Sequence, residues 1–243
     1  MATALPVVGT LHRLLPLHAA NALGGTFPSP NHGPRRDGAS PSLVVIHYTA
    51  MADCAAAQRV LCDPATEVSA HYLIAPNGSV TALVPEDRRA WHAGRGSWGS
   101  LMDINSHSIG IELSNTGFAP FAAPLMDALC DLLPGILSRW SIPPHRVIGH
   151  SDMAPGRKID PGPGFDWARL AKSGLAVTAN PGPLPAYDAS ALGAALRLIG
   201  YPDLPLDTVL PAFRLRHRPR YGGPADALDL ALATDLAHRF PAP

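Results

Sequence analysis

Two short apolar runs, each followed by a histidine, constrain the fold of this chain more than any other feature. Residues 43–46 (LVVI) are followed by His47, and residues 147–149 (VIG) are followed by His150. The first run has no polar position on either face, which is typical of a strand buried on both sides. The sequence therefore predicts interior strands with an imidazole at the end of each.

Alternation and turn signals predict further strands and helices. The turn signal Pro-Asn-Gly at 76–78 separates residues 69–75 from residues 79–84, which predicts a hairpin. Residues 107–114 (HSIGIELS) alternate strictly and predict another strand. Helical patterns cover 54–63, 122–140 with a kink expected at Pro134, and a segment that starts near Phe165, whereas 26–42, 91–106 and 150–164 show no regular pattern.

The composition changes near residue 180. Residues 180–186 (NPGPLPA) are rich in proline and are predicted to form a linker. Beyond it, residues 187–200 and 224–240 have helical patterns. The connection between them is proline-rich and contains a cluster of basic residues at 214–220. We expect an irregular lead-in over 1–41, a main domain over 42–179 that would fold by itself, and a small helical module over 187–243.

The composition also excludes several classes of function. Charged residues make up 16% of the 243 residues, below the roughly 25% of average proteins, and the formal net charge is zero. No basic surface for nucleic acid is therefore expected. No stretch reaches the about 20 apolar residues that a membrane span needs, so none is predicted. The oligomeric state is left open.

The cysteines and the N-terminus bear on the compartment. Cys54, Cys62 and Cys130 are odd in number and lack a Cys-x-x-Cys spacing, so a disulfide framework is not expected, although one Cys54–Cys62 bridge stays open. Residues 1–25 lack a basic region before their apolar part and are not predicted to be a secretory signal. We therefore expect a cytoplasmic protein, with the periplasm or cell envelope as the alternative.

A carboxylate joins the two histidines as a candidate metal ligand. Asp160 lies in residues 156–162 (GRKIDPG). Two imidazoles and one carboxylate are a common ligand set for catalytic zinc. Each residue alone has a plainer explanation, because a histidine at a strand end is more often structural and an aspartate before proline can cap a turn. The prediction depends on the combination, and Asp152 is a competing ligand.

Lys158 lies two residues before Asp160. Because the proline after Asp160 favours an extended backbone, residues i and i+2 are expected to point the same way. Lys158 and Asp160 would then enter one pocket, where a fixed ammonium group could stabilise an oxyanion. The alternative is a surface ion pair worth under about 1 kcal/mol.

Glu112 interrupts the apolar pattern of its predicted strand. It shares a face with Gly110, which leaves room beside it, while the apolar residues of the strand point the other way. A carboxylate on a central strand is costly to bury. A general base that takes a proton from a metal-bound water would explain it. The alternative is an edge strand with Glu112 in solvent.

The segment 91–106 carries two tryptophans, and surface loops on a sheet often hold binding groups. His92 lies in this loop and His71 in a predicted strand. Each could either contact a substrate or support the metal ligands. The predicted substrate contacts are His71, Trp91, His92 and Asn105.

Five motifs occur in order along residues 42–172. They are HYTA (47–50), VSAHYLI (68–74), RAWHAG (89–94), SIGIELSN (108–115) and GHSDMAPGRKIDPGPGFDWARL (149–170). Together they resemble the zinc-dependent N-acetylmuramoyl-L-alanine amidases, a bacterial family that shares its fold with the peptidoglycan-recognition proteins. The last motif is highly specific.

This resemblance implies a mixed α/β fold, with a central mixed β-sheet flanked by helices. It implies that His47, His150 and Asp160 bind one zinc ion. It also implies that Glu112 is the catalytic acid and base and that Lys158 supports the transition state. The implied reaction is hydrolysis of the amide between N-acetylmuramic acid, or its 1,6-anhydro form, and the L-alanine of muropeptides, in cell-wall turnover or recycling.

The motifs LRLIGY (196–201) and AFRLRHRP (212–219) resemble the C-terminal peptidoglycan-binding-like module of two-domain family members. Arg214 stands where that module has a glutamine, so we expect little glycan binding. Such two-domain relatives are exported lipoproteins, but no lipobox is found here. The single-domain relatives are cytoplasmic recyclers of 1,6-anhydro-muropeptides.

Two other functions fit the same residues. One is a peptidoglycan-recognition module without catalysis, although such proteins typically lose a metal ligand and here each ligand position is filled. The other is a zinc endopeptidase that cuts within the stem peptide, since the same chemistry serves any amide.

Overall fold

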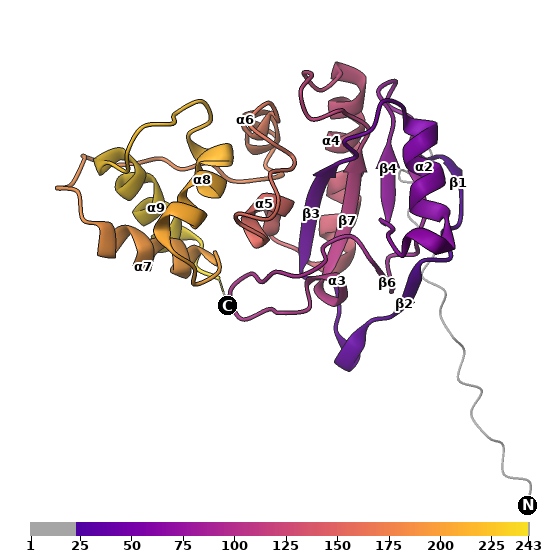
Figure 1. Ribbon diagram of the computed structural model, residues 1–243, viewed down its shortest axis with the longest axis horizontal. Coiled ribbons are helices and arrows are strands. Elements are labelled where there is room, and N and C mark those ends of the chain that lie inside the picture. Colours follow the sequence, from indigo (N-terminus) through magenta and orange to yellow (C-terminus); the bar gives the residue numbers. More distant parts are fainter. Residues whose placement is uncertain (1–22, 243) are drawn as a thin grey trace, which may run out of the picture.

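A six-stranded sheet forms the centre of the protein in this computed structural model, which describes residues 23–242 (Figure 1). Neighbouring strands are parallel except for the predicted hairpin, which is antiparallel, so the sheet is mixed as the resemblance implied. The strands in spatial order are β1 (Leu23–Thr26), β5 (Val80–Ala82), β4 (Tyr72–Ile74), β7 (Ser108–Leu113), β3 (Leu43–Tyr48) and β8 (Val147–Gly149).

The two longest strands, β3 and β7, lie side by side near the middle of this sheet. Residues 43–46 of β3 have no exposed surface, which confirms the buried strand predicted from the apolar run. β7 pairs with β3 on one side and with β4 on the other. Glu112 therefore lies on a central strand, and the alternative of an edge strand is wrong.

The register of the parallel strands aligns their carboxyl ends. His47 of β3 is paired with Glu112 of β7. On the other side of β3, Ile46 is paired with Gly149, the residue before His150. Because parallel strands end at the same edge of a sheet, this register brings the two histidines and Glu112 to one edge.

Helices cover both faces of the sheet. Helix α4 (Ala123–Trp140) packs on the face formed by the apolar residues of β7, with Pro134 inside it. Helix α2 (Cys54–Cys62) packs on the opposite face of β4 and ends before Pro64, as predicted. The shorter helices are α3 (Ile104–His107), α5 (His150–Met153) and α6 (Trp167–Lys172), with single 3-10 turns at Arg36–Gly38, Pro64–Thr66 and Pro144–Arg146.

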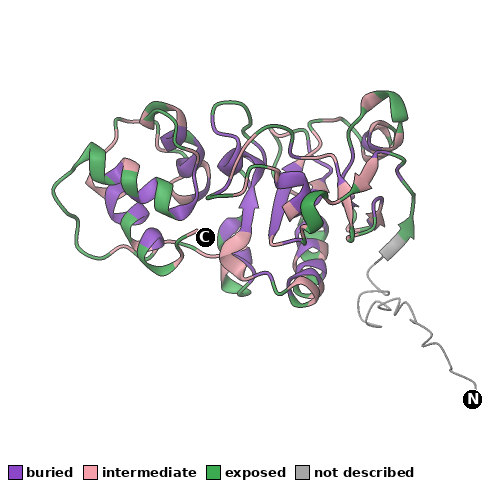
Figure 2. Cartoon of the chain, turned by 90° about the horizontal axis from the view of Figure 1, so that it is seen from below, coloured by how far each residue is buried: buried purple, intermediate pink, exposed green. Residues whose placement is uncertain are grey.

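Three helices follow at the C-terminus, namely α7 (Ala189–Ile199), α8 (Leu206–His217) and α9 (Ala227–Arg239). They lie beside α5 and α6 on the β3 side of the molecule (Figure 1). Leu43 and Val45 of β3 belong to the same apolar cluster as residues of these three helices. Figure 2 shows buried residues running through both the sheet and the C-terminal helices. The helical module and the sheet thus share one core.

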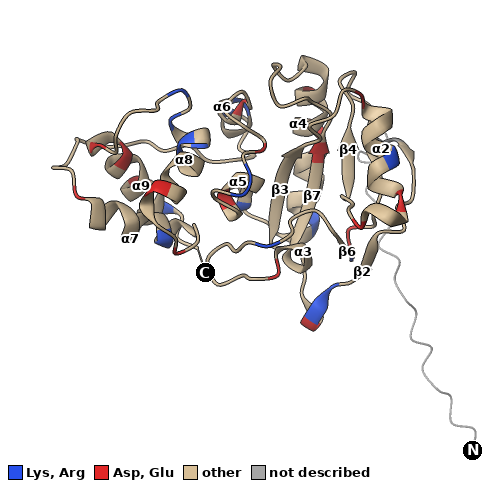
Figure 3. Ribbon diagram, viewed as in Figure 1, with Lys and Arg blue, Asp and Glu red and all other residues tan. Residues whose placement is uncertain are grey.

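Helix α8 corrects the prediction for the segment between the other two C-terminal helices. That segment was expected to be a proline-rich, basic connection, but Leu206–His217 is helical, with Pro205 as its N-cap and Pro211 inside it. Arg214 and Arg216 of the basic cluster at 214–220 are buried, and Arg214 forms an ion pair with Asp229 of α9. Figure 3 accordingly shows basic residues on α8 and acidic residues on α9.

Two further segments are more regular than predicted. The lead-in contains β2 (His32–Pro34), which pairs with β6 (Arg88–Ala90) in a separate two-stranded sheet. The segment after residue 149 begins with α5 rather than with irregular structure. Both elements depend on partners far away in the sequence.

The prediction for residues 1–25 falls almost entirely outside the described part of the chain. Within residues 23–242, no helix is long and apolar enough to cross a bilayer. Cys54, Cys62 and Cys130 are all unpaired thiols.

Candidate active site

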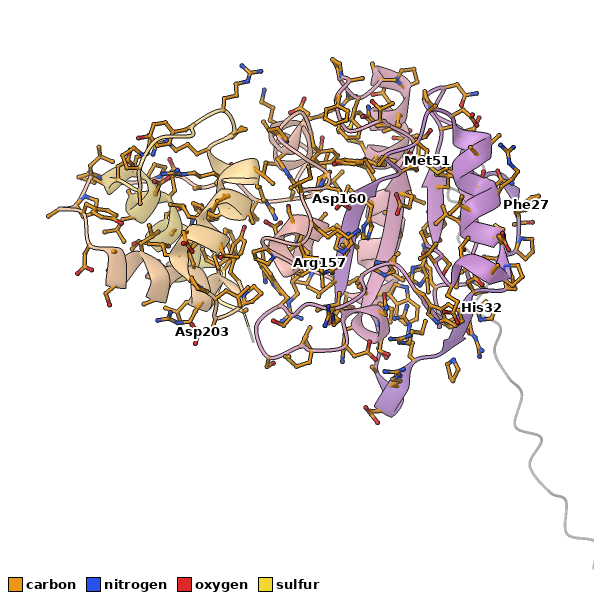
Figure 4. The ribbon with its side chains drawn as sticks, viewed as in Figure 1. Phe27, His32, Met51, Arg157, Asp160 and Asp203 are labelled. Atoms are coloured by element: carbon orange, nitrogen blue, oxygen red, sulfur yellow. The ribbon has the colours of Figure 1, made fainter. Side chains whose placement is uncertain are left out.

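His47, His150 and Asp160 converge at the carboxyl edge of the sheet. The Nδ1 atoms of the two histidines lie 2.9 Å apart, and Asp160 Oδ2 lies 3.1 Å from His47 Nδ1 and 3.0 Å from His150 Nδ1. All three residues are buried. Figure 4 shows Asp160 beside β3 at this point. The three residues predicted from scattered motifs therefore form one cluster, which we call the HHD cluster.

Hydrogen bonds outside the HHD cluster fix the proton of His150. Its Nε2 lies 2.8 Å from the carbonyl oxygen of Ala93. A carbonyl oxygen only accepts, so Nε2 of His150 carries the hydrogen and donates it. The lone pair of Nδ1 is then left to face the cluster.

A longer chain of hydrogen bonds does the same for His47. The hydroxyl of Ser108 donates to Ile104 O across 2.5 Å, so its oxygen accepts from Nε2 of His92 at 3.1 Å. His92 Nδ1 is then an acceptor, and it lies 3.0 Å from His47 Nε2, which must donate. His47 therefore also presents a bare Nδ1 to the cluster.

This donor set suits a cation. Two nitrogen lone pairs and a carboxylate oxygen face one another at about 3 Å, an arrangement that is repulsive without a positive charge between them. Burial, together with the neighbouring His150, lowers the pKa of His47 from 6.5 to about 4, so the ring is neutral at pH 7. Neutral imidazole is the form that binds metals. The HHD cluster therefore fits a divalent metal ion.

The competing ligand Asp152 is engaged elsewhere. Its Oδ1 accepts a hydrogen bond from the Tyr201 hydroxyl at 2.6 Å, and its Oδ2 accepts one from the backbone N–H of Gly149 at 2.8 Å. Asp152 is not a member of the HHD cluster. The geometry favours Asp160 as the carboxylate ligand.

A cavity of about 360 Å³ opens above the HHD cluster. It brings together the five residues predicted for metal binding and catalysis, and two of the four predicted substrate contacts. Those that line it are His47, Trp91, His92, Glu112, His150, Lys158 and Asp160.

Glu112 contributes a carboxyl group to this cavity. Its Oε2 is buried and has no hydrogen-bond partner among residues 23–242. Burial, with a smaller effect of the negative charge on Asp160, raises the pKa of Glu112 from 4.5 to about 8. Near neutral pH such a group can both hold and release a proton, which is what acid–base catalysis requires.

Gly110 serves His92 rather than leaving open space. A Cβ atom at Gly110 would lie 2.4 Å from Cγ of His92, so the imidazole fills the room that the missing side chain provides. The sequence predicted open room beside Glu112, whereas in the structure the imidazole of His92 fills it.

Lys158 lies at the exposed rim of the cavity. Its side chain forms no ion pair with any acidic residue of the described chain, so the alternative of a surface ion pair is not what the structure shows. Arg157, the preceding residue, instead points back and donates from Nη2 to Ala93 O at 2.7 Å. It thereby holds the carbonyl that fixes His150.

His71 and Asn105 lie outside the lining of the cavity. His71 is fully buried, with Nδ1 accepting from Gly110 N at 2.9 Å and Nε2 3.1 Å from Arg88 O. Asn105 Oδ1 accepts from the backbone N–H groups of His92 and Ala93. Both residues hold backbone segments in place. No sequence signal reveals the roles of Ala93 O or Ile104 O, because every residue carries a carbonyl.

The chain is similar to known proteins of one family. Residues 37–163 match the family described as N-acetylmuramoyl-L-alanine amidase. The N-acetylmuramoyl-L-alanine amidase AmiD of Escherichia coli is 37% identical over 231 residues, covering 82% of this chain and 83% of AmiD. The 1,6-anhydro-N-acetylmuramyl-L-alanine amidase AmpD of Citrobacter freundii is 35% identical, covering 59% of this chain and 86% of AmpD.

Solved structures of two amidases superpose on most of this chain. AmiD in complex with its substrate anhydro-N-acetylmuramic acid-L-Ala-D-gamma-Glu-L-Lys superposes with a TM-score of 0.75 at 36% identity, covering 84% of this chain and 92% of that one. AmpDh3 of Pseudomonas aeruginosa in complex with anhydromuramic pentapeptide also gives 0.75, at 32% identity, covering 89% of this chain and 96% of that one.

Proposed function

Because the chain belongs to the N-acetylmuramoyl-L-alanine amidase family, we propose that its HHD cluster holds the zinc ion of an enzyme that cleaves muropeptides between muramic acid and L-alanine. The observation that carries this proposal is the mutual approach of His47, His150 and Asp160 within 3.1 Å, beside Glu112, whose Oε2 is buried. Zinc suits the cluster because it prefers nitrogen and carboxylate ligands and few of them. When bound, zinc polarises a carbonyl group and lowers the pKa of water toward ~7.

Glu112 acts as the acid and base. In the metal-free protein, burial raises its pKa to about 8, so this carboxyl group can hold and release a proton near neutral pH. In the forward reaction it takes a proton from the attacking water and passes it to the nitrogen of the departing L-alanine. The water oxygen bonds to the carbonyl carbon and the C–N bond breaks. L-alanine then leaves with its nitrogen protonated, and the muramic acid part keeps a carboxyl group.

Lys158 stabilises the negative charge that develops on the carbonyl oxygen. It lies on the cavity rim two residues from Asp160, and its ammonium group has no competing acidic partner in the described chain. A positive charge placed in advance costs no reorganisation during the reaction. Trp91 offers an apolar surface on the same cavity for the substrate.

The substrate is a muropeptide with either ordinary or 1,6-anhydro muramic acid, and we favour the anhydro form because both superposed complexes contain it. We keep a cytoplasmic location as part of the proposal. It rests on the cysteines, which are unpaired thiols in the described part of the chain.

Mass analysis of products tests the proposal against both alternatives. Zinc-loaded protein is incubated with anhydro-N-acetylmuramic acid-L-Ala-D-γ-Glu-L-Lys. An amidase releases the intact tripeptide with a free L-alanine amine. An endopeptidase leaves L-alanine attached to the sugar, and a recognition module releases nothing. Either of the last two outcomes would overturn the proposal.

A further inference from the structure

Two side chains of the C-terminal segment contact the main domain (residues 42–179, here called the amidase part) beside the HHD cluster. Tyr201, which follows α7, donates a hydrogen bond to Asp152 Oδ1 at 2.6 Å. Arg216 of α8 donates from Nη1 to Val147 O at 3.0 Å and lies 3.6 Å from Asp152 Oδ2. All three side chains are buried, so these contacts are shielded from water.

Asp152 also bonds to the backbone of the turn that carries His150. Its Oδ2 accepts from the N–H of Gly149, which closes the first turn of α5 at residue 149. His150 is the first residue of that helix, and Ser151 N donates to Asp160 O at 2.9 Å. One short helix therefore carries one residue of the HHD cluster and fixes the backbone of another.

Arg216 is itself held rigidly. Its guanidinium group stacks over the ring of Trp167 at 4.1 Å, and its Nη2 donates to Val177 O at 3.3 Å. A buried arginine that meets an aromatic face and two carbonyl groups has little freedom to move. Its charge is therefore fixed next to the Asp152 carboxylate.

The motif of the module is also used for internal packing. Arg214 lies in the segment 212–219 that resembles the peptidoglycan-binding-like module. It is buried, pairs with Asp229 and donates to Gly223 O and Pro224 O. This side chain joins α8 to α9 and is not available to a glycan.

We propose that the C-terminal helices brace the metal centre, with Tyr201 and Arg216 as positioning residues that act through Asp152 on His150 and Asp160. The proposal rests on the metal-binding role proposed above for the HHD cluster. Binding a metal requires three ligand atoms at fixed positions, and partners that orient ligands typically change metal affinity 10–100-fold. The helical module therefore contributes to metal affinity without touching the metal or the substrate.

The test is Tyr201→Phe, which removes one hydroxyl and keeps the ring contacts with Trp98 and Phe213. Tyr72→Phe is the matched control. The Tyr72 hydroxyl donates to Glu86 Oε1 at the same 2.6 Å. Tyr72 is also buried, and it lies on the opposite face of the sheet from Glu112. Zinc affinity is measured by competition with a chelator, and the absorption spectrum of bound cobalt reports ligand geometry.

We expect Tyr201→Phe to weaken zinc binding about tenfold and to alter the cobalt spectrum. Tyr72→Phe should lower the melting temperature but leave both metal readouts unchanged. Arg216→Met should weaken zinc binding further. If Tyr201→Phe and Tyr72→Phe bind zinc and cobalt like the wild type, the brace is refuted. If the wild type itself binds no zinc, the proposed function fails instead, so the two failures are distinguishable.

Discussion

Nε2 of His47 donates a hydrogen bond to Nδ1 of His92 across 3.0 Å, and this bond decides which nitrogen of His47 faces the HHD cluster. His92 can accept because its own Nε2–H is engaged with Ser108. Burial also lowers the pKa of His92 well below its usual range, which keeps the ring neutral. A residue predicted as either a substrate contact or a support for the metal ligands is thus placed to support His47.

Replacing His92 by phenylalanine should therefore weaken metal binding. His47 would lose the partner that holds its Nε2 proton, and we expect zinc affinity to fall roughly 10–100-fold. Chelator competition measures the affinity. His217→Phe, which removes another partly buried histidine, here within the C-terminal helices, is the control and should bind zinc normally. Unchanged affinity in His92→Phe would contradict this assignment.

Removing the carboxylate ligand should have a larger effect. Purified wild-type protein should contain about one zinc per chain, and Asp160→Ala should lose most of it after dialysis. Asp152→Asn should still take up one zinc when zinc is in excess, because that carboxylate faces Tyr201 and Gly149. Metal analysis of both variants checks the ligand set. Full occupancy in Asp160→Ala would move the assignment to Asp152.

The burial of Glu112 predicts a pH-dependent stability of the metal-free protein. Its pKa is about 8 in the folded state and near 4.5 when exposed, so the folded state holds a proton that the unfolded state has lost between these values. The contribution of Glu112 to the free energy of unfolding is therefore fully present below about pH 4.5. It is lost progressively as the pH rises toward 8.

Glu112→Gln should remove this loss. Relative to the variant, the free energy of unfolding of the wild type should fall by roughly 1 kcal/mol per pH unit between pH 5 and 8. Denaturant unfolding at several pH values, with zinc removed from both proteins, measures the difference. A difference that does not change with pH would show that Glu112 ionises normally in the fold.

The shared core predicts that the amidase part does not fold well alone. The proline-rich linker suggested an independent unit ending near Ala179, yet Leu43, Val45 and Ile148 belong to one apolar cluster with residues of α7–α9. A chain ending at Ala179 would lack the α7–α9 part of this cluster, so we expect poor solubility or a much lower melting temperature. A soluble truncated protein with wild-type stability and zinc affinity would contradict both the shared core and the brace.

Local patterns were enough to predict the parts of the fold that carry the chemistry. The apolar run at 43–46 and the alternation at 108–113 identified β3 and β7, and the residues at their ends, His47 and Glu112, lie in register. The run at 147–149 identified His150, and the segment 156–162 identified Lys158 and Asp160, and all three line the same cavity. The apolar pattern reveals the burial of both strands. In β3 every residue of the run is apolar, and in β7 every second residue is apolar.

The remaining features depend on distant partners. Helix α8 contains a proline and several arginines, and it is helical because Arg214 meets Asp229 and Arg216 meets Trp167. His71 and Asn105 resembled binding residues by type, but their hydrogen bonds to backbone groups place them behind the cavity. Composition and spacing do not report such long-range contacts.

The most direct test of the proposed mechanism is the turnover of zinc-loaded Glu112→Gln on anhydro-N-acetylmuramic acid-L-Ala-D-γ-Glu-L-Lys. The variant keeps the HHD cluster, so it should bind zinc like the wild type while kcat falls about 10²–10⁴-fold, the usual contribution of a general acid and base. A near-wild-type kcat in a variant with full zinc occupancy would contradict the assignment of Glu112 and the mechanism built on it.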